Sequence, residues 1–179
     1  YINATTDGAV DGNLSVTASG DITQTVALAV TGTTTLVASG NDITLDTSTN
    51  NFATVVITSG RNVALRDAGA IILGASTVSG TYSVTAGGHI TDNDTQEITG
   101  VTTLVAGGYD ITLDTSTNNF AAAVVITSGR NVAITDEDTI VLGAATVSGT
   151  YAVTATTGGI TDSGTQEITG VTTLVAGSS

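Results

Sequence analysis

The chain repeats itself with a period of about 70 residues, and this period restricts its fold more than any other feature. The segment Asp42–Phe52, which reads DITLDTSTNNF, recurs at Asp110–Phe120. The segment Thr95–Gly107, which reads TQEITGVTTLVAG, recurs at Thr165–Gly177. A fixed long period is typical of solenoids and related architectures, in which each unit packs only on its neighbours.

Each long repeat contains shorter units, in which an apolar residue is followed by a small residue, a glycine and then Ile or Val. The residues that lead these units are Val16, Leu36, Val56, Val84, Leu104, Val125, Val153 and Leu174, so that two short units alternate with one longer unit. A second apolar column keeps step at Ile22, Ile43, Val63, Ile90, Ile111, Val132 and Ile160. We therefore expect about seven coils of about 20–28 residues, in three-coil groups of about 68–70 residues.

Apolar columns that advance together at one coil length predict an all-β chain folded as a parallel β-helix, or β-solenoid. Thr, Val and Ile favour strands, because branched side chains suit a pleated surface. Helices are disfavoured, because no window has apolar residues at the i, i+3, i+4 period and Gly interrupts the chain too often. An ordinary β-sandwich is the main structural alternative.

We expect a single solenoid domain over residues 1–179, as a segment of a longer chain. The repeat groups are expected at approximately 12–79, 80–148 and 149–179, the last of them partial. At either end of such a rod, the outermost strand has an open edge that is a template for further pairing. Self-association end to end is therefore expected.

Alternation in the first strand of each coil predicts which side chains face the core. The eight leading residues are expected inside, stacked coil on coil, with their chain neighbours pointing outward. The outward positions are mostly hydroxyl residues in the first coil of each group and apolar residues in the third. This grouping suggests a lateral contact stripe, consisting of Val37, Val55, Ile57, Val105, Val124 and Ile126. The competing interpretation is ordinary β-propensity on a solvated sheet.

Composition excludes several classes of function. Three basic residues stand against 16 acidic ones, for a net charge of −13, so nucleic-acid binding is not expected. The absence of Cys excludes disulfides, thiol nucleophiles and cysteine metal sites. The chain has no apolar run of roughly 18 residues that could span a membrane. With a single His, most acid–base and phosphoryl chemistries lack their parts, and we expect neither an enzyme nor a cofactor.

One cluster of acidic residues is a candidate calcium site. In the segment Thr91–Glu97, TDNDTQE, the side chains of Asp92, Asp94 and Glu97 could supply oxygen ligands. The cluster lacks the glycine and spacing of an EF-hand loop and the GGxGxD nonapeptide of calcium-binding β-rolls. Its counterpart, Thr161–Glu167, reads TDSGTQE and has lost one of the three acids. A solvated acidic turn is the competing interpretation.

Other polar and aromatic residues recur between repeats or lie in turns. Tyr82 aligns with Tyr151 and is expected to serve in packing, and Arg61 aligns with Arg130. Asparagine pairs precede the two Phe residues, and we expect turn hydrogen bonds from Asn50, Asn51, Asn118 and Asn119. The single histidine, His89, is expected in a solvated turn.

The repeated phrases resemble those of a known class of bacterial proteins. GTTTLVASGNDITLD, NNFATVVITSGRNVAL and ILGASTVSGTYSVTAGGHIT are similar to the β-strand repeats of giant filamentous-haemagglutinin-like surface adhesins and their relatives with autotransporter-type β-helical passengers. The resemblance covers the chain from about Gly12 to its end. It implies a right-handed parallel β-helix exported to the cell surface, serving as a stalk, an adhesin or a fibre of a biofilm matrix. It implies no catalytic residues.

The sequence therefore predicts a structural extracellular segment that forms a stiff rod, as an adhesin stalk or as a self-assembling surface or matrix fibre. The partners expected are other copies of the chain, end to end or laterally, and a host or surface receptor. The alternative is a module that binds ice or a flat polysaccharide through a Thr-rich face, although the outward Thr rows are broken at the third coil of each group. A third hypothesis is a polysaccharide-cleaving enzyme that uses paired carboxylates.

Overall fold

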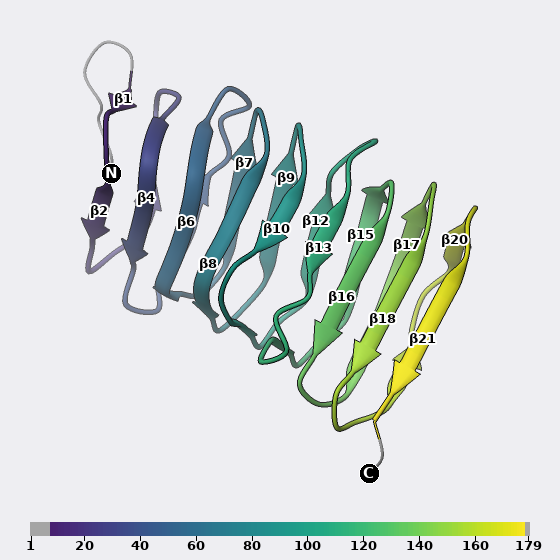
Figure 1. The fold of residues 1–179 in the computed structure, drawn as a ribbon. Coiled ribbons are helices and arrows are strands. Elements are labelled where there is room, and N and C mark those ends of the chain that lie inside the picture. Colours follow the sequence, from purple (N-terminus) through teal and green to yellow (C-terminus); the bar gives the residue numbers. More distant parts are fainter. Residues whose placement is uncertain (1–7, 178–179) are drawn as a thin grey trace.

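The computed structural model describes residues 8–177, and all their regular elements are β-strands (Figure 1). The chain winds into coils, so that strands one coil apart in the sequence lie side by side. Every strand pairing is parallel. Within these residues no helix is long and apolar enough to cross a membrane. The predicted all-β parallel solenoid is confirmed.

The coils build two parallel sheets with one hydrophobic core between them. The twelve-stranded sheet contains β1 (Ala9–Val10), β2 (Leu14–Thr17), β4 (Ala29–Val37), β6 (Asn51–Gly60), β8 (Ile71–Val78), β10 (Ile90–Asp92), β11 (Gln96–Ile98), β13 (Ile111–Leu113), β14 (Asn119–Phe120), β16 (Val132–Asp136), β18 (Tyr151–Ala155) and β21 (Thr172–Ala176). The nine-stranded sheet contains β3 (Ile22–Thr23), β5 (Ile43–Leu45), β7 (Val63–Asp67), β9 (Tyr82–Ala86), β12 (Thr102–Val105), β15 (Val124–Gly129), β17 (Ile140–Val147), β19 (Ile160–Asp162) and β20 (Gln166–Ile168).

The pairing register sets the length of each coil. One of the shortest steps pairs Val124 with Leu142, and one of the longest pairs Thr102 with Val124. The described residues therefore make about eight coils of nearly uniform length rather than seven. The prediction of a long coil at every third position was wrong. Strands β8 and β17 are separate layers of the stack, but neither contains one of the leading residues from which the coils were counted.

The long sequence repeat contains three and a half coils, not three. Strands β4, β6 and β8 lie in the twelve-stranded sheet, whereas their sequence counterparts β12, β15 and β17 lie in the nine-stranded sheet. Each repeat thus places the same sequence on the opposite face of the rod. Two repeats complete seven coils and return a given sequence to its starting face.

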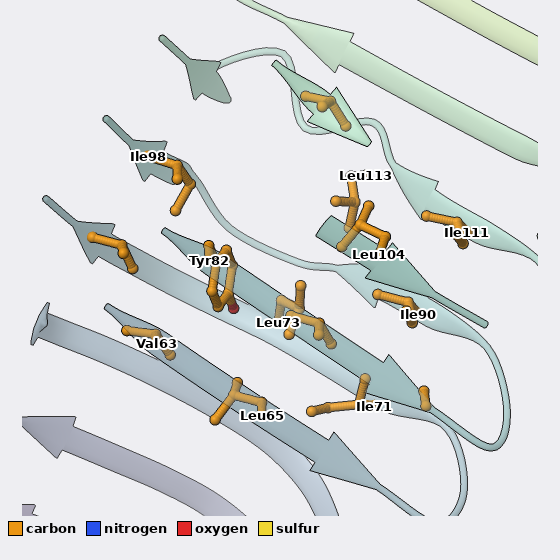
Figure 2. Packing of buried hydrophobic residues seen from close by; sticks show 14 of the residues in the cluster. Val63, Leu65, Ile71, Leu73, Tyr82, Ile90, Ile98, Leu104, Ile111 and Leu113 are labelled. Atoms are coloured by element: carbon orange, nitrogen blue, oxygen red, sulfur yellow. The ribbon is translucent and has the colours of Figure 1, made fainter. Parts of the chain in front are cut away.

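The core is formed by alternate residues of the strands in both sheets, as Figure 2 shows for Val63 and Leu65 of β7 and for Ile71 and Leu73 of β8. Apolar side chains stack along the rod, since parallel pairing aligns Leu65 with Val84 of the next coil. Tyr82 fills the core beside them and is 1% exposed, which confirms its expected packing role.

The predicted lateral stripe was wrong for four of its six residues. Val55 and Ile57 pair with the buried residues Thr34 and Leu36, and both are fully buried. Their counterparts Val124 and Ile126 are 1% exposed. The other two stripe residues, Val37 and Val105, are partly exposed.

A β-bulge caused this error of one residue. The pairing of β4 with β6 shifts after Leu36, so that Val37 pairs with Ser59 and Thr58 is the extra residue. The repeat pattern places the core residue four positions before the corner glycine, which here is Gly60, and so it assigned Val56 to the core. Because of the bulge, the residues that lie inside are its neighbours Val55 and Ile57. Val56 and its counterpart Val125 are partly exposed on the outer faces.

The outward Val56 side chain lies against a glycine of the next strand. A Cβ atom on Gly74 would be 2.6 Å from Val56 Cγ2, and a Cβ on Gly143 would be 2.6 Å from Val125 Cγ2. Both distances are too short for any side chain. Glycine at these two positions therefore allows neighbouring coils to approach each other beneath a branched residue.

We expect Gly74→Ala to lower the free energy of unfolding by about 1–3 kcal/mol, because the added methyl group overpacks against Val56. The measurement is urea unfolding followed by circular dichroism. Gly20→Ala is the matched control, since nothing lies within 4 Å of a Cβ at Gly20. The double variant Gly74→Ala with Val56→Ala should regain part of the lost stability. Equal effects of the two glycine substitutions would contradict this account.

Candidate functional site: polar corners, buried turn networks and the last coil

A cluster of polar side chains joins three successive coils at one edge of the rod. Arg61 donates Nε and Nη2 to the two carboxylate oxygens of Asp42, at 2.8 and 2.9 Å. Asn62 donates its backbone N and its Nδ2 to Asp42 Oδ1, at 3.1 and 3.0 Å. In the following coil, the backbone N and Oγ1 of Thr81 both donate to Asn62 Oδ1 at 3.1 Å. The cluster thus fastens each corner to the next one along the axis.

The same cluster recurs in the second repeat with nearly the same geometry. Arg130 donates Nε and Nη2 to Asp110 at 2.7 Å each, and Asn131 donates to Asp110 Oδ1 at 3.1 and 3.0 Å. Thr150 donates to Asn131 Oδ1 at 3.1 Å. Asp42 lies before a strand of the nine-stranded sheet and Asp110 before a strand of the twelve-stranded sheet, so the two corner clusters occupy opposite edges of the rod.

Sequence reasoning aligned Arg61 with Arg130 but missed their partners. The signal was present, because each Arg-Asn pair follows an Asp at a distance of one coil. The two-pronged geometry matches the guanidinium fork to a carboxylate. The arginine side chains remain about half exposed, at 56% and 52%. These ion pairs therefore order the corners rather than bury charge.

The coil before each cluster differs between the repeats. The backbone N of Asp42 donates to Asp21 Oδ1 at 3.0 Å, whereas the backbone N of Asp110 donates to His89 Nδ1 at 3.2 Å. His89 also meets the ring of Tyr109 edge-on, with ring centroids 5.5 Å apart. The histidine side chain is 47% exposed in a turn, as expected.

Hydrogen bonds from the arginines lower the pKa values of the corner carboxylates Asp42 and Asp110. The side-chain hydrogen bond from Arg61 lowers the pKa of Asp42 to about 2. The corresponding bond from Arg130 holds the pKa of Asp110 well below its usual range. Because both folded pKa values are depressed, the stability from these carboxylates is present above their ordinary pKa of 3.8 and is lost as the pH falls through the folded values.

We expect the double variant Asp42→Asn with Asp110→Asn to melt a few degrees below the unchanged chain at pH 6. The difference should shrink as the pH falls from about 4 toward 2, because the unchanged chain then loses the stability that its two carboxylates supply. Thermal unfolding followed by circular dichroism across this range measures it. A difference that stays constant with pH would show that the carboxylate charge is not the source.

The three candidate calcium ligands have separate roles in the structure. Asp92 Oδ1 accepts a hydrogen bond from the backbone N of Asp114 at 3.2 Å, and its Oδ2 accepts one from Asn118 Nδ2 at 2.6 Å. Asp94 Oδ1 accepts one from the backbone N of Thr95 at 2.8 Å. Glu97 is exposed on β11. Across residues 8–177, no three His, Asp or Glu side chains gather closely enough to hold a metal ion.

Two of the four expected turn asparagines are buried between coils. Asn118 Oδ1 accepts a hydrogen bond from the backbone N of Gln96 at 2.8 Å, while its Nδ2 donates to Asp92. In the first repeat, Asn50 exchanges hydrogen bonds with Gln24 and accepts one from the backbone N of Leu28 at 2.9 Å. Both asparagines are fully buried. Their partners belong to the preceding coil, so each network fastens two coils together.

The next residue of each pair, Asn51 or Asn119, begins a strand and is not buried. We expect Asn118→Ala to lower the free energy of unfolding by about 2–3 kcal/mol, because it leaves the Asp92 carboxylate and the Gln96 N–H short of a buried partner. Asn119→Ala is the control and should change stability by less than about 0.5 kcal/mol. Denaturant unfolding of the two variants makes the comparison. A similar loss in both would refute the proposed network.

Two further carboxylates are buried beside the phenylalanines. Asp67 accepts hydrogen bonds from the backbone N of Phe52 in the preceding coil and of Gly69. Asp136 accepts them from the backbone N of Phe120, at 2.8 Å, and of Asp138. Burial raises the pKa of both carboxyl groups. Both carboxylates accept hydrogen bonds from backbone N–H groups, which indicates a structural role rather than a reactive one.

The last described coil exposes residues that the same sequence buries elsewhere. Thr95–Gly107 and Thr165–Gly177 have one sequence, yet Leu104 is fully buried and Leu174 is 52% exposed. In the earlier copy, β15 covers β12 and aligns Ile126 with Leu104. In the described residues β21 pairs with β18 and with no later strand. Burial of Leu104 therefore depends on the strand of the following coil.

The comparisons with known proteins agree with this repeat architecture. One family matches the chain three times in succession, over residues 2–59, 60–127 and 129–179. No curated protein and no solved structure matches it. The family description names no adhesin, so that part of the resemblance stays a prediction. The three matches cover almost the whole chain, which therefore belongs to the family described as repeats of unknown function (DUF5649).

Proposed function

We propose that this chain is a structural segment that forms a stiff rod outside the cell, in the stalk of an adhesin or in a surface or matrix fibre. The observation that carries the proposal is the continuous stacking of parallel coils around one core. Each coil contacts only its neighbours, so the molecule grows in one dimension as repeats are added. The corner clusters and the buried asparagines link coils along the same axis.

The coil-on-coil pairing of β12 with β15 supports lengthening of the rod. We propose that β21 is covered by a further coil of this repeat, of the kind that β15 provides for its counterpart β12. Covering Leu174 in this way removes a large apolar side chain from water. It also gives hydrogen-bond partners to the unpaired backbone N–H and C=O groups at the edge of β21.

A purely structural role is supported by the use of the recurring polar groups. Asp42 and Asp110 accept hydrogen bonds from arginine side chains. Asp67 and Asp136 accept hydrogen bonds from backbone N–H groups. Each of these carboxylates holds the coil in shape. The proposal accordingly includes no catalytic residue and no cofactor.

Small-angle X-ray scattering and electron microscopy test the rod. Eight coils at a strand spacing of about 4.8 Å predict a particle about 40 Å long for the chain alone. Stacking should lengthen it at constant cross-section, with an axial repeat of about 34 Å for seven coils. A compact particle of equal dimensions, or a chain that bends within its length, would overturn the proposal.

The variant Leu174→Asp tests the stacking surface. It should abolish lengthening while leaving the fold intact, because this side chain is already half exposed in the single chain. Thr173→Asp, on the outer side of the same strand, is the control with the same charge. If both variants lengthen like the unchanged chain, β21 is not the stacking surface.

The extracellular location needs a separate experiment. Antibodies raised against the chain should label intact cells that produce it. Brief protease treatment of those cells should remove the label. Labelling that appears only after the cells are permeabilised would contradict an extracellular role.

A further inference from the structure

A small group of polar side chains interrupts the apolar core of the rod. Ser76 of β8 and Gln96 of β11 are register partners in the twelve-stranded sheet, and both are buried. Tyr82, the first residue of β9 in the nine-stranded sheet, follows Ser76 around one corner and is also buried (Figure 2). We call these three residues the core polar cluster. It involves two successive coils and both sheets.

The hydrogen bonds made by this cluster leave two of its oxygens without a partner. Ser76 Oγ donates to the Gly74 carbonyl at 3.1 Å, and Gln96 Nε2 donates to the carbonyls of Gly74 and Asp94, at 2.9 Å each. The amide hydrogens of Gln96 are therefore both used. Among residues 8–177, neither Gln96 Oε1 nor Tyr82 Oη has a hydrogen-bond partner.

The three side chains offer one hydrogen-bond donor and two acceptors. Burial raises the pKa of the Tyr82 phenol, and the neighbouring Ser76 hydroxyl acts in the opposite direction. The phenol therefore keeps its proton at neutral pH and can donate it to a hydrogen bond. Ser76 Oγ has used its own proton on the Gly74 carbonyl, so its lone pairs can accept. Gln96 Oε1 is the second acceptor.

The same two atoms lack a partner in the second repeat. Tyr151 Oη and Gln166 Oε1 are buried and make no hydrogen bond within the part of the chain that the structure describes. Gln166 Nε2 donates to the Gly143 carbonyl at 2.6 Å, as its counterpart does to Gly74. Ala145 stands in the place of the serine. A buried polar atom without a partner costs stability, so a recurring pair of such atoms points to a ligand that satisfies both.

We propose that the core polar cluster binds an internal water molecule between Tyr82, Ser76 and Gln96. The water accepts a hydrogen bond from Tyr82 Oη and donates to Gln96 Oε1 and Ser76 Oγ. Three hydrogen bonds, about the usual number for a buried water, are then formed. An anion would find only the phenol as a donor, and a cation would face the phenolic proton. Water is the ligand that matches one donor and two acceptors.

The bound water ties the two sheets together inside the core, where the surrounding contacts are apolar. The corresponding site at Tyr151 offers two partners instead of three, because Ala145 has no hydroxyl group. A water molecule should therefore leave that site faster than it leaves the core polar cluster. This inference concerns the interior of the rod and does not depend on where the rod is used.

Oxygen-17 relaxation dispersion of the solvent tests the proposal, because it counts waters held inside a protein and is unaffected by exchanging hydroxyl hydrogens. Tyr82→Phe removes only the hydroxyl group and should lower the number of internal waters by about one. Tyr109→Phe is the matched control, since it makes the same chemical change on a tyrosine that is 46% exposed. The control should keep the water count of the unchanged chain.

Urea unfolding of the same two variants gives a second readout. Tyr82→Phe should unfold at a lower urea concentration than Tyr109→Phe, because the bound water and Gln96 Oε1 lose a hydrogen-bonded link to the opposite sheet. If the Tyr82 hydroxyl were simply unpaired in the core, its removal would leave the midpoint unchanged or raise it. The proposal is overturned by that result, or by equal water counts in the two variants.

Discussion

The parallel backbone pairing between successive coils is the interaction on which the rest of this structure depends. It requires that inward and outward residues of neighbouring coils coincide, since a shift of one residue would exchange the two faces. Leu36 above Ile57 and Leu104 above Ile126 meet this requirement although the flanking sequences differ in length. The bulge at Thr58 absorbs the difference, and Gly74 makes room for the residue displaced outward.

The extra half coil in each repeat determines on which face of the rod each copy of a surface side chain lies. A repeat of whole coils would place every copy of a side chain on one face. With three and a half coils, the Asp42 and Asp110 clusters occupy opposite edges, and Val56 and Val125 occupy opposite faces. Neither edge nor face is therefore specialised over the length of two repeats.

The architecture could be predicted from the sequence, because apolar columns such as Ile43 and Val63 mark each coil directly. The number of coils could not, since the segment Ile71–Val78 lacks the small-glycine-apolar phrase and was hidden inside a long unit. The orientation of Val56 was missed because a bulge leaves no trace in spacing alone. The corner partner of Arg61 was within reach, since Asp42 lies one coil earlier, but identifying it required the correct coil length.

The coils are similar to one another, so the stack could slip by one coil, and the buried polar networks oppose this slip. Apolar stacking of Val on Leu or Ile tolerates displacement by one coil, because similar side chains meet again. Asn118 does not, since the coil before it supplies both an acceptor, the Asp92 carboxylate, and a donor, the backbone N of Gln96. A displaced coil would leave these buried groups unpaired, at a cost of about 1–3 kcal/mol for each. Polar residues in this core thus select one register, while the apolar residues supply most of the stabilisation.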